Sequence, residues 1–72
     1  MLLMKQYDTF VLEEDLNPGI KKGMEGVVLE ILSNDDILVE FVKDDGTNYE
    51  YNGEAIFTIK KNLIYLKESA SR

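Results

Sequence analysis

Residues 19–42 read GIKKGMEGVVLEILSNDDILVEFV, and this stretch decides the fold of the chain. It contains two apolar runs, residues 27–32 and 37–43, separated by the turn-forming sequence Ser-Asn-Asp-Asp. Gly23 and Gly26 precede the first run, and we expect both to adopt backbone angles that other residues disfavour. Apolar and β-branched runs bounded by turn residues are typical of strands. The stretch therefore predicts a β-hairpin that the chain enters through a glycine-rich turn.

The two strands of this hairpin differ in pattern. Residues 27–32 break strict alternation, which indicates a bulge or a bend, and bent strands close small barrels. Residues 37–43 carry apolar residues on both faces, as central strands do. In the first strand we expect Val28 and Ile31 to lie in the core and Glu30 to point outward. In the second strand we expect one face to carry Ile37, Val39 and Phe41, and the other face to carry Leu38 and Val42.

The chain before the hairpin predicts one more strand and a loop. Residues 7–13 alternate in hydrophobicity, with Phe10 and Leu12 on one face. An Asn-Pro-Gly sequence follows, which is strong turn chemistry because proline fixes φ and glycine accepts positive φ. We therefore expect a strand over residues 7–13 and then a loop over residues 16–22 that Leu16 and Ile20 anchor inward.

The chain after the hairpin carries two further turn signals. Gly46 closes an Asp-Asp-Gly turn, and Asn52-Gly53 favours a type I′ turn, which needs positive φ at both central residues. Residues 60–62 predict a short 3₁₀ turn. We expect a strand over residues 47–51, with Tyr49 and Tyr51 on one face, and a strand over residues 54–59, with Ala55, Phe57 and Ile59 on one face. A last short strand covers residues 63–66. The tail that follows, residues 67–72, is expected to fray.

Five or six short antiparallel strands joined by tight turns predict an all-β fold, a small barrel. Seventy-two residues make one domain at most, and we expect its core within residues 7–66.

Composition restricts the function. The 14 acidic and 8 basic residues give a net charge of −6. This argues against nucleic acid as a partner, because nucleic-acid affinity comes largely from Lys and Arg, and it favours a basic partner protein. The chain has no cysteine and no histidine, so it has neither thiolate metal ligands nor an imidazole base. We expect no enzyme activity, no cofactor and no metal.

The same composition predicts a cytoplasmic protein. No apolar run approaches the roughly 18 residues of a membrane span, and the N-terminal Met-Leu-Leu-Met is too short for a signal peptide. We therefore expect no membrane association.

Three motifs resemble a family of small bacterial proteins of unknown function. They are DxFxL at residues 8–12, DLxPGIxxGxxGxV at residues 15–28 and VEFxxDxG at residues 39–46. The chain departs from the family pattern at Asn17 and Val27, and residues 49–54 look like an extra stretch. The resemblance implies a single SH3-like barrel over residues 1–72, without catalytic residues. Small acidic members of such families look like immunity proteins that neutralise a bacterial toxin.

Acidic residues and tyrosines are the candidates for binding a partner. Rows of carboxylates complement a basic surface, and tyrosine is favoured in interface hot spots. The alternative is that the acids are solvated loop residues and that the tyrosines pack on the barrel, and the sequence leaves both interpretations open. We expect Tyr65 to be structural. The partner-binding candidates are Glu13, Glu14, Asp15, Asp44, Asp45, Tyr49, Glu50 and Tyr51, with Glu54 joining them if the loops converge.

Two other functions stay open at this point. The lysine doublets at residues 21–22 and 60–61 could form a phosphate-binding patch of an RNA-binding or ribosome-associated module. An accessory subunit of a larger complex is the other alternative. For the oligomeric state we expect a monomer or a homodimer formed through an edge strand.

Overall fold

The computed structural model describes residues 4–68, which form one antiparallel sheet of five strands. The order of the strands in the sheet is β4-β3-β2-β1-β5, so β1 and β5, which are far apart in the chain, are neighbours. A single 3₁₀ turn, η1, joins β4 to β5. The strands are β1 (Thr9–Leu12), β2 (Glu25–Ile31), β3 (Asp36–Phe41), β4 (Ile56–Lys60) and β5 (Ile64–Glu68), and η1 covers Lys61–Leu63.

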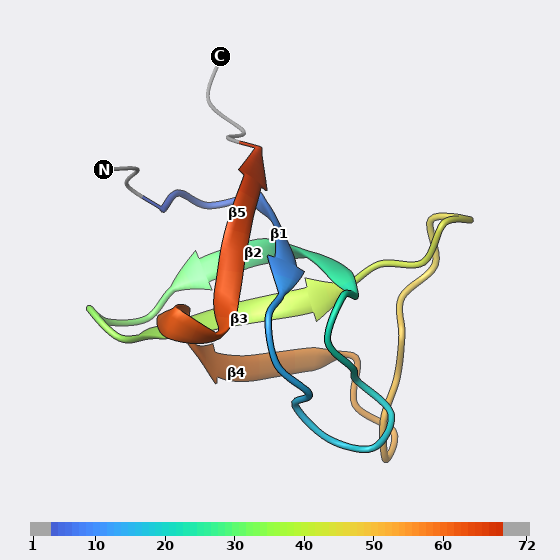
Figure 1. The fold of residues 1–72 in the computed structure, drawn as a ribbon. Coiled ribbons are helices and arrows are strands. Elements are labelled where there is room, and N and C mark those ends of the chain that lie inside the picture. The colour runs from blue at the N-terminus through green and yellow to red at the C-terminus, as the bar shows by residue number, and fades with distance from the viewer. Residues whose placement is uncertain (1–3, 69–72) are drawn as a thin grey trace.

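The sheet bends sharply and wraps around its own core (Figure 1). In that view β3 and β4 run across the molecule, whereas β5 crosses in front of them at a steep angle. The bend passes through β2, whose pairing with β3 shifts register between Val28 and Glu30. This is the predicted bulge, and with the strand order and the 3₁₀ turn it makes the fold the small SH3-like barrel that the sequence predicts.

Strict alternation along β1 and β3 builds the core. Phe10 and Leu12 of β1 are buried, and the Phe10 ring meets the Phe41 ring edge to face, with 5.6 Å between centroids. Ile20, from the loop between β1 and β2, is fully buried as predicted, and Leu16 packs against the core. The buried core residues are Phe10, Leu12, Ile20, Val28, Ile37, Val39, Phe41, Ile59 and Ile64.

The prediction for Gly26 is wrong. Gly23 has a φ of 95° as expected, but Gly26 lies within β2 and is not among the residues with positive φ. Because Gly26 has no side chain, the backbone of β3 at Glu40 and the ring of Phe10 can pack closely against it. A Cβ at this position would overlap the Glu40 carbonyl oxygen and lie 2.5 Å from Cζ of Phe10. Glycine is therefore needed here because of tertiary contacts.

Ile31 is also not the core residue that we predicted. It lies opposite the buried Ile37, but it is 38% exposed. The strand ends at Ile31, and the residues that follow at positions 32–35 are exposed, so they leave the outer end of the Ile31 side chain uncovered.

Residues 47–51 do not form the predicted strand. They lie in a long connection between β3 and β4 and make isolated bridges, Val42 with Asn48 and Tyr51 with Glu54. The Asn52-Gly53 turn is confirmed, because these residues have φ of 53° and 80°.

Lys67, expected in the tail, belongs to β5, and its Nζ forms an ion pair with Glu25 at 2.9 Å. The rest of the predicted tail, residues 69–72, lies outside the described residues.

None of the helical structure within residues 4–68 is long and apolar enough to cross a membrane.

Candidate partner-binding surface

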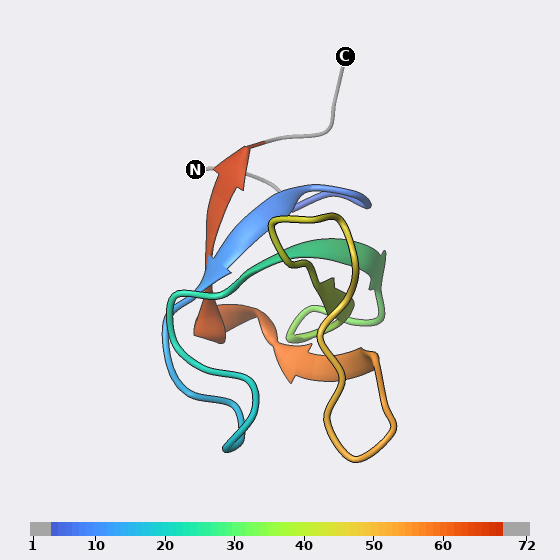
Figure 2. The ribbon, with the colours of Figure 1, turned by 90° about the vertical axis from the view of Figure 1, so that its right-hand side faces the viewer.

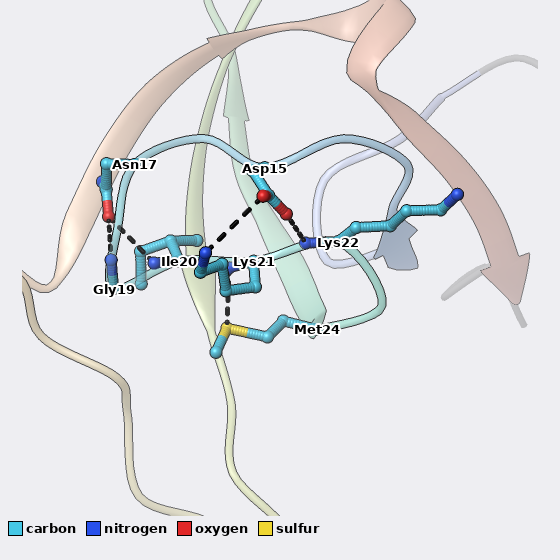
Figure 3. Close-up of polar contacts among 7 residues, drawn as sticks. All are labelled: Asp15, Asn17, Gly19, Ile20, Lys21, Lys22 and Met24. Atoms are coloured by element: carbon cyan, nitrogen blue, oxygen red, sulfur yellow. Dashed lines mark hydrogen bonds and ion pairs between the residues drawn. The ribbon is translucent and has the colours of Figure 1, made fainter.

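The loop between β1 and β2 is held by its own hydrogen bonds (Figure 3). Asp15 accepts a hydrogen bond from the Lys22 backbone N–H at 2.8 Å, and its other carboxylate oxygen lies 3.6 Å from Nζ of Lys21. The Lys22 N–H, and to a smaller extent the charge of Lys21, lower the pKa of Asp15 below its ordinary value. This candidate residue therefore fastens the two ends of the loop to each other.

Asn17 organises the tip of the same loop. Its side-chain oxygen accepts hydrogen bonds from the backbone N–H groups of Gly19, at 2.9 Å, and Ile20, at 2.8 Å. The sulfur of Met24 accepts a further contact from the Lys21 N–H at 3.4 Å. With Ile20 inserted in the core, these hydrogen bonds hold the loop in a defined conformation.

Asp45 holds the turn at the start of the connection between β3 and β4. It accepts hydrogen bonds from the Thr47 hydroxyl, at 2.6 Å, and from the Thr47 backbone N–H, at 2.9 Å. These bonds, the one from the hydroxyl first, lower the pKa of Asp45. Gly46 has a φ of 89°, so it supplies the left-handed position that the sequence predicts. Asp44 is exposed beside it.

The two candidate tyrosines are partly buried and pack against the core. The Tyr49 ring also lies beneath Nζ of Lys43, which is 5.3 Å from its centroid. The Tyr51 ring lies directly on Gly19, because a Cβ at Gly19 would be 2.7 Å from Cδ1 of Tyr51. Both tyrosines therefore attach the connection to the barrel, and Tyr51 joins it to the tip of the loop between β1 and β2.

The candidate acids fall into two groups. Glu50 precedes Tyr51 in the chain, and Tyr51 contacts Gly19 at the tip of the loop that begins with Glu13 and Glu14. The turn at residues 44–46 points away from that loop in both Figure 1 and Figure 2. The contact of Tyr51 with Gly19 thus joins the loop that carries Glu13, Glu14 and Asp15 to the connection that carries Tyr49, Glu50 and Tyr51, although Glu13 itself lies at the start of the loop, where its N–H bonds to the Leu63 carbonyl. Asp44 and Asp45 lie on the turn that points away from this loop.

A groove next to Glu13 was not predicted. It has a volume of about 360 Å³ and is lined by residues from β1, the following loop and β5. Tyr65, which we expected to be structural, is 64% exposed at its wall. Because the buried Ile64 precedes it, strand alternation could have placed Tyr65 outside. The lining residues are Val11, Leu12, Glu13, Lys22, Gly23 and Tyr65.

The lysine doublets are partly neutralised by acids. Lys21 pairs with Asp15, and Nζ of Lys60 lies 2.8 Å from Asp36. The hydrogen bond with Asp36 raises the pKa of Lys60. Half of the proposed phosphate-binding patch is therefore occupied by carboxylates of the same chain.

Comparisons of the chain with family models, with curated proteins and with solved structures give no match.

Proposed function

We propose that this chain is a non-catalytic protein-binding module, and most concretely an acidic immunity protein that neutralises a bacterial toxin by covering its basic surface. The observation that carries the proposal is the joined pair of acid-bearing segments. The loop with Glu13 and Glu14 and the connection with Glu50 meet where Tyr51 packs on Gly19.

The charges on these segments are available to a partner. The side chains of Glu13, Glu14 and Glu50 are exposed, and within residues 4–68 they make no hydrogen bond or ion pair. Complementary charge accelerates association with a basic protein and excludes partners of like charge. A net charge of −6 extends the same attraction over the molecule.

The loop conformation favours tight binding as well. Ordering a flexible loop on binding costs conformational entropy, and a loop that is already held avoids most of that cost. Asp15 and Asn17 supply this order through their hydrogen bonds to the backbone of the loop. These two residues therefore support the binding surface without needing to touch the partner.

The groove offers an apolar contact beside the acids. Val11 and Tyr65 are opposite each other on β1 and β5, and Glu13 lies at the edge of the same groove. An exposed tyrosine next to an apolar wall is the kind of feature found at interface hot spots. Lys22 also lines the groove, so we propose that a side chain of the partner places its apolar stem on Val11 and directs its positive charge toward Glu13.

The test is capture of the partner from the native host by tagged protein, with washes at low and at high salt. The informative variant is Glu13→Lys/Glu14→Lys. Its matched control is Glu30→Lys/Asp35→Lys, which changes the net charge equally at exposed positions elsewhere. Mass spectrometry identifies the bound proteins.

We expect one stoichiometric basic protein that is lost at high salt and lost with the Glu13→Lys/Glu14→Lys variant, but retained by the control. Ribosomal proteins or RNA that bind both variants and are lost when Lys22 and Lys61 are changed would contradict the proposal. That result would favour the RNA-binding alternative.

A further inference from the structure

Tyr7 has a backbone conformation that tyrosine disfavours. Its φ is 70°, whereas the other positions with positive φ within residues 4–68 are glycines and Asn52. In the left-handed region Cβ comes too close to the following carbonyl oxygen, so few residues other than glycine, asparagine and aspartate enter it. For a bulky aromatic residue such an angle is an outlier that calls for a specific cause.

The cause is a tight turn that leads into β1. The Asp8 N–H donates to the Lys5 carbonyl at 3.1 Å, which closes a type II turn with Tyr7 at its third position. Tyr7 and Asp8 both face Val28 of β2, whose carbonyl accepts from the Tyr7 N–H and whose N–H donates to the Asp8 carbonyl. Two residues opposite one make a β-bulge, and a left-handed first residue of a bulge is typically glycine. Tyrosine therefore stands where both the turn and the bulge favour glycine.

Side chains hold the turn in this conformation. The buried Asp8 carboxylate accepts a hydrogen bond from the Lys5 backbone N–H at 2.8 Å. The Gln6 side chain donates to the Leu29 carbonyl at 3.0 Å. Together with the backbone bonds of the bulge, these contacts fix the turn against β2. The surrounding structure thus over-determines the strained angle, which is the condition for such strain to persist.

The Tyr7 side chain does not offset the strain by contacts within the described chain. It is 57% exposed, and it is not among the apolar residues that pack against the core. Within residues 4–68 its hydroxyl has no hydrogen-bond partner and its ring has no aromatic or cation contact. Stability alone would favour glycine or asparagine here. Residues that break a local rule without a gain in stability concentrate at functional sites.

We propose that Tyr7 is a contact residue for a protein partner, and that its ring enters an apolar pocket of that partner with a hydrogen-bond acceptor at its base. Tyrosine is enriched at interface hot spots, where the ring is desolvated and the hydroxyl is bonded. The fixed turn presents the ring in one backbone conformation, so little has to be ordered on binding.

The shape and the charge around Tyr7 select a protein as the partner. Small molecules bind in concave sites, whereas Tyr7 stands exposed on a tight turn, so the pocket has to belong to the partner. A nucleic acid would need several basic side chains beside the ring for its phosphates. Residues 5–8 and 28–30 expose one charge of each sign, Lys5 and Glu30. The contact is therefore apolar, and its strength should not depend on salt.

This contact is separate from the acids of the proposed function. Tyr7 precedes β1 and Glu13 follows it, so the two residues lie at opposite ends of the strand. In Figure 1 the chain enters β1 at the upper side of the molecule and leaves it toward the loop at the lower side. The proposal for Tyr7 therefore does not rest on the proposed function, and each of them can fail alone.

Site-specific photo-crosslinking in the native host tests the contact. The aromatic crosslinker p-benzoylphenylalanine is introduced in place of Tyr7 and, as a matched control, in place of Ile56, which is 51% exposed on β4. Circular dichroism checks that both proteins are folded. We expect one protein to be crosslinked from position 7 and not from position 56. No crosslink from position 7, or a crosslink to nucleic acid alone, would overturn the proposal.

Removal of the side chain provides a second test. Tyr7→Gly should raise Tm by a few degrees, because it relieves the strain. In calorimetric titration it should nevertheless bind the purified crosslinked protein roughly 30-fold more weakly than wild type, at low and at high salt. Asn52→Gly, a change at the other non-glycine residue with positive φ, is the control and should leave the affinity unchanged. A lower Tm of Tyr7→Gly would make the side chain structural, and an unchanged affinity would exclude the contact, so either result would overturn the proposal.

Discussion

Replacement of Gly26 by alanine tests the close packing of β2 most sharply. A Cβ at Gly26 would overlap the Glu40 carbonyl oxygen and lie 2.5 Å from Cζ of Phe10. Carbon atoms in contact are normally about 3.5–4.0 Å apart, so the second overlap alone is at least about 1 Å. The Phe10 ring cannot easily withdraw, because it is fully buried against Phe41. Relief therefore requires movement of the β2–β3 ladder.

The expected cost follows from these two overlaps. Overpacking a core costs ~1–3 kcal/mol, and an overlap with backbone places Gly26→Ala at the upper end, near ~3 kcal/mol. For a domain of this size, that corresponds to a fall in Tm of roughly 12–24 °C. Since a core this small rarely supplies more than ~3–5 kcal/mol, much of the stability would be lost. Thermal and urea unfolding, followed by circular dichroism, measure the change.

Gly46 provides the control, because it has a φ of 89° and open space around it. Gly46→Ala should cost only about 1–2 kcal/mol, and Gly46→Asn should cost less than Gly46→Ala, since asparagine tolerates left-handed angles. At Gly26 the order should reverse, with Gly26→Asn more destabilising than Gly26→Ala. If Gly26→Asn were the more stable of the two, backbone conformation and not packing would explain this glycine, and the steric reasoning would be refuted.

Three further predictions concern the loops. Gly53→Ala should cost about 1–2 kcal/mol and lower Tm by several degrees, because Gly53 has a φ of 80° and nothing near it, and thermal unfolding measures the loss. Gly19→Ala should displace the Tyr51 ring, which nuclear magnetic resonance would detect as shifts in both the 16–20 loop and the 49–54 segment; shifts confined to the loop would contradict the contact. Asp15→Asn keeps an acceptor for the Lys22 N–H but removes a carboxyl whose pKa is lowered from 3.8. A carboxyl whose pKa is lowered by folding stabilises the protein fully at pH values above its ordinary pKa, and this stabilisation is lost as the pH falls through the lowered pKa. The variant should therefore be less stable than wild type at pH 7 and equally stable well below pH 3.8. A Tm difference that does not change with pH would contradict this.

Much of the fold could be predicted because it follows from local rules. The alternation of Ile37, Val39 and Phe41 places them on one face whatever the partner strands are. Asn52-Gly53 forms its turn because of the backbone angles that these two residues accept. The bulge after Val28 is visible as a break in alternation.

The failures depend on tertiary structure. Gly26 is needed because β3 and Phe10 approach it, and neither neighbour can be identified from the sequence around it. The segment with Tyr49 has the alternation of a strand, but within the described residues it finds no partner beyond isolated bridges. Its connection to the loop at Gly19 depends on contacts between residues more than thirty positions apart. The candidate acids were found by composition, but only the fold separates Asp15 and Asp45, which hold turns, from Glu13 and Glu14, whose side chains make no hydrogen bond or ion pair within residues 4–68.

We propose that the exposed acids Glu13 and Glu14 neutralise a basic, toxic partner. The most direct measurement is the growth of cells that express the captured partner together with this chain. We expect growth with wild-type protein and with the Glu30→Lys/Asp35→Lys control, but arrest with the Glu13→Lys/Glu14→Lys variant, although circular dichroism shows it folded. Equal protection by all three proteins, or a partner that does not arrest growth, would contradict the account.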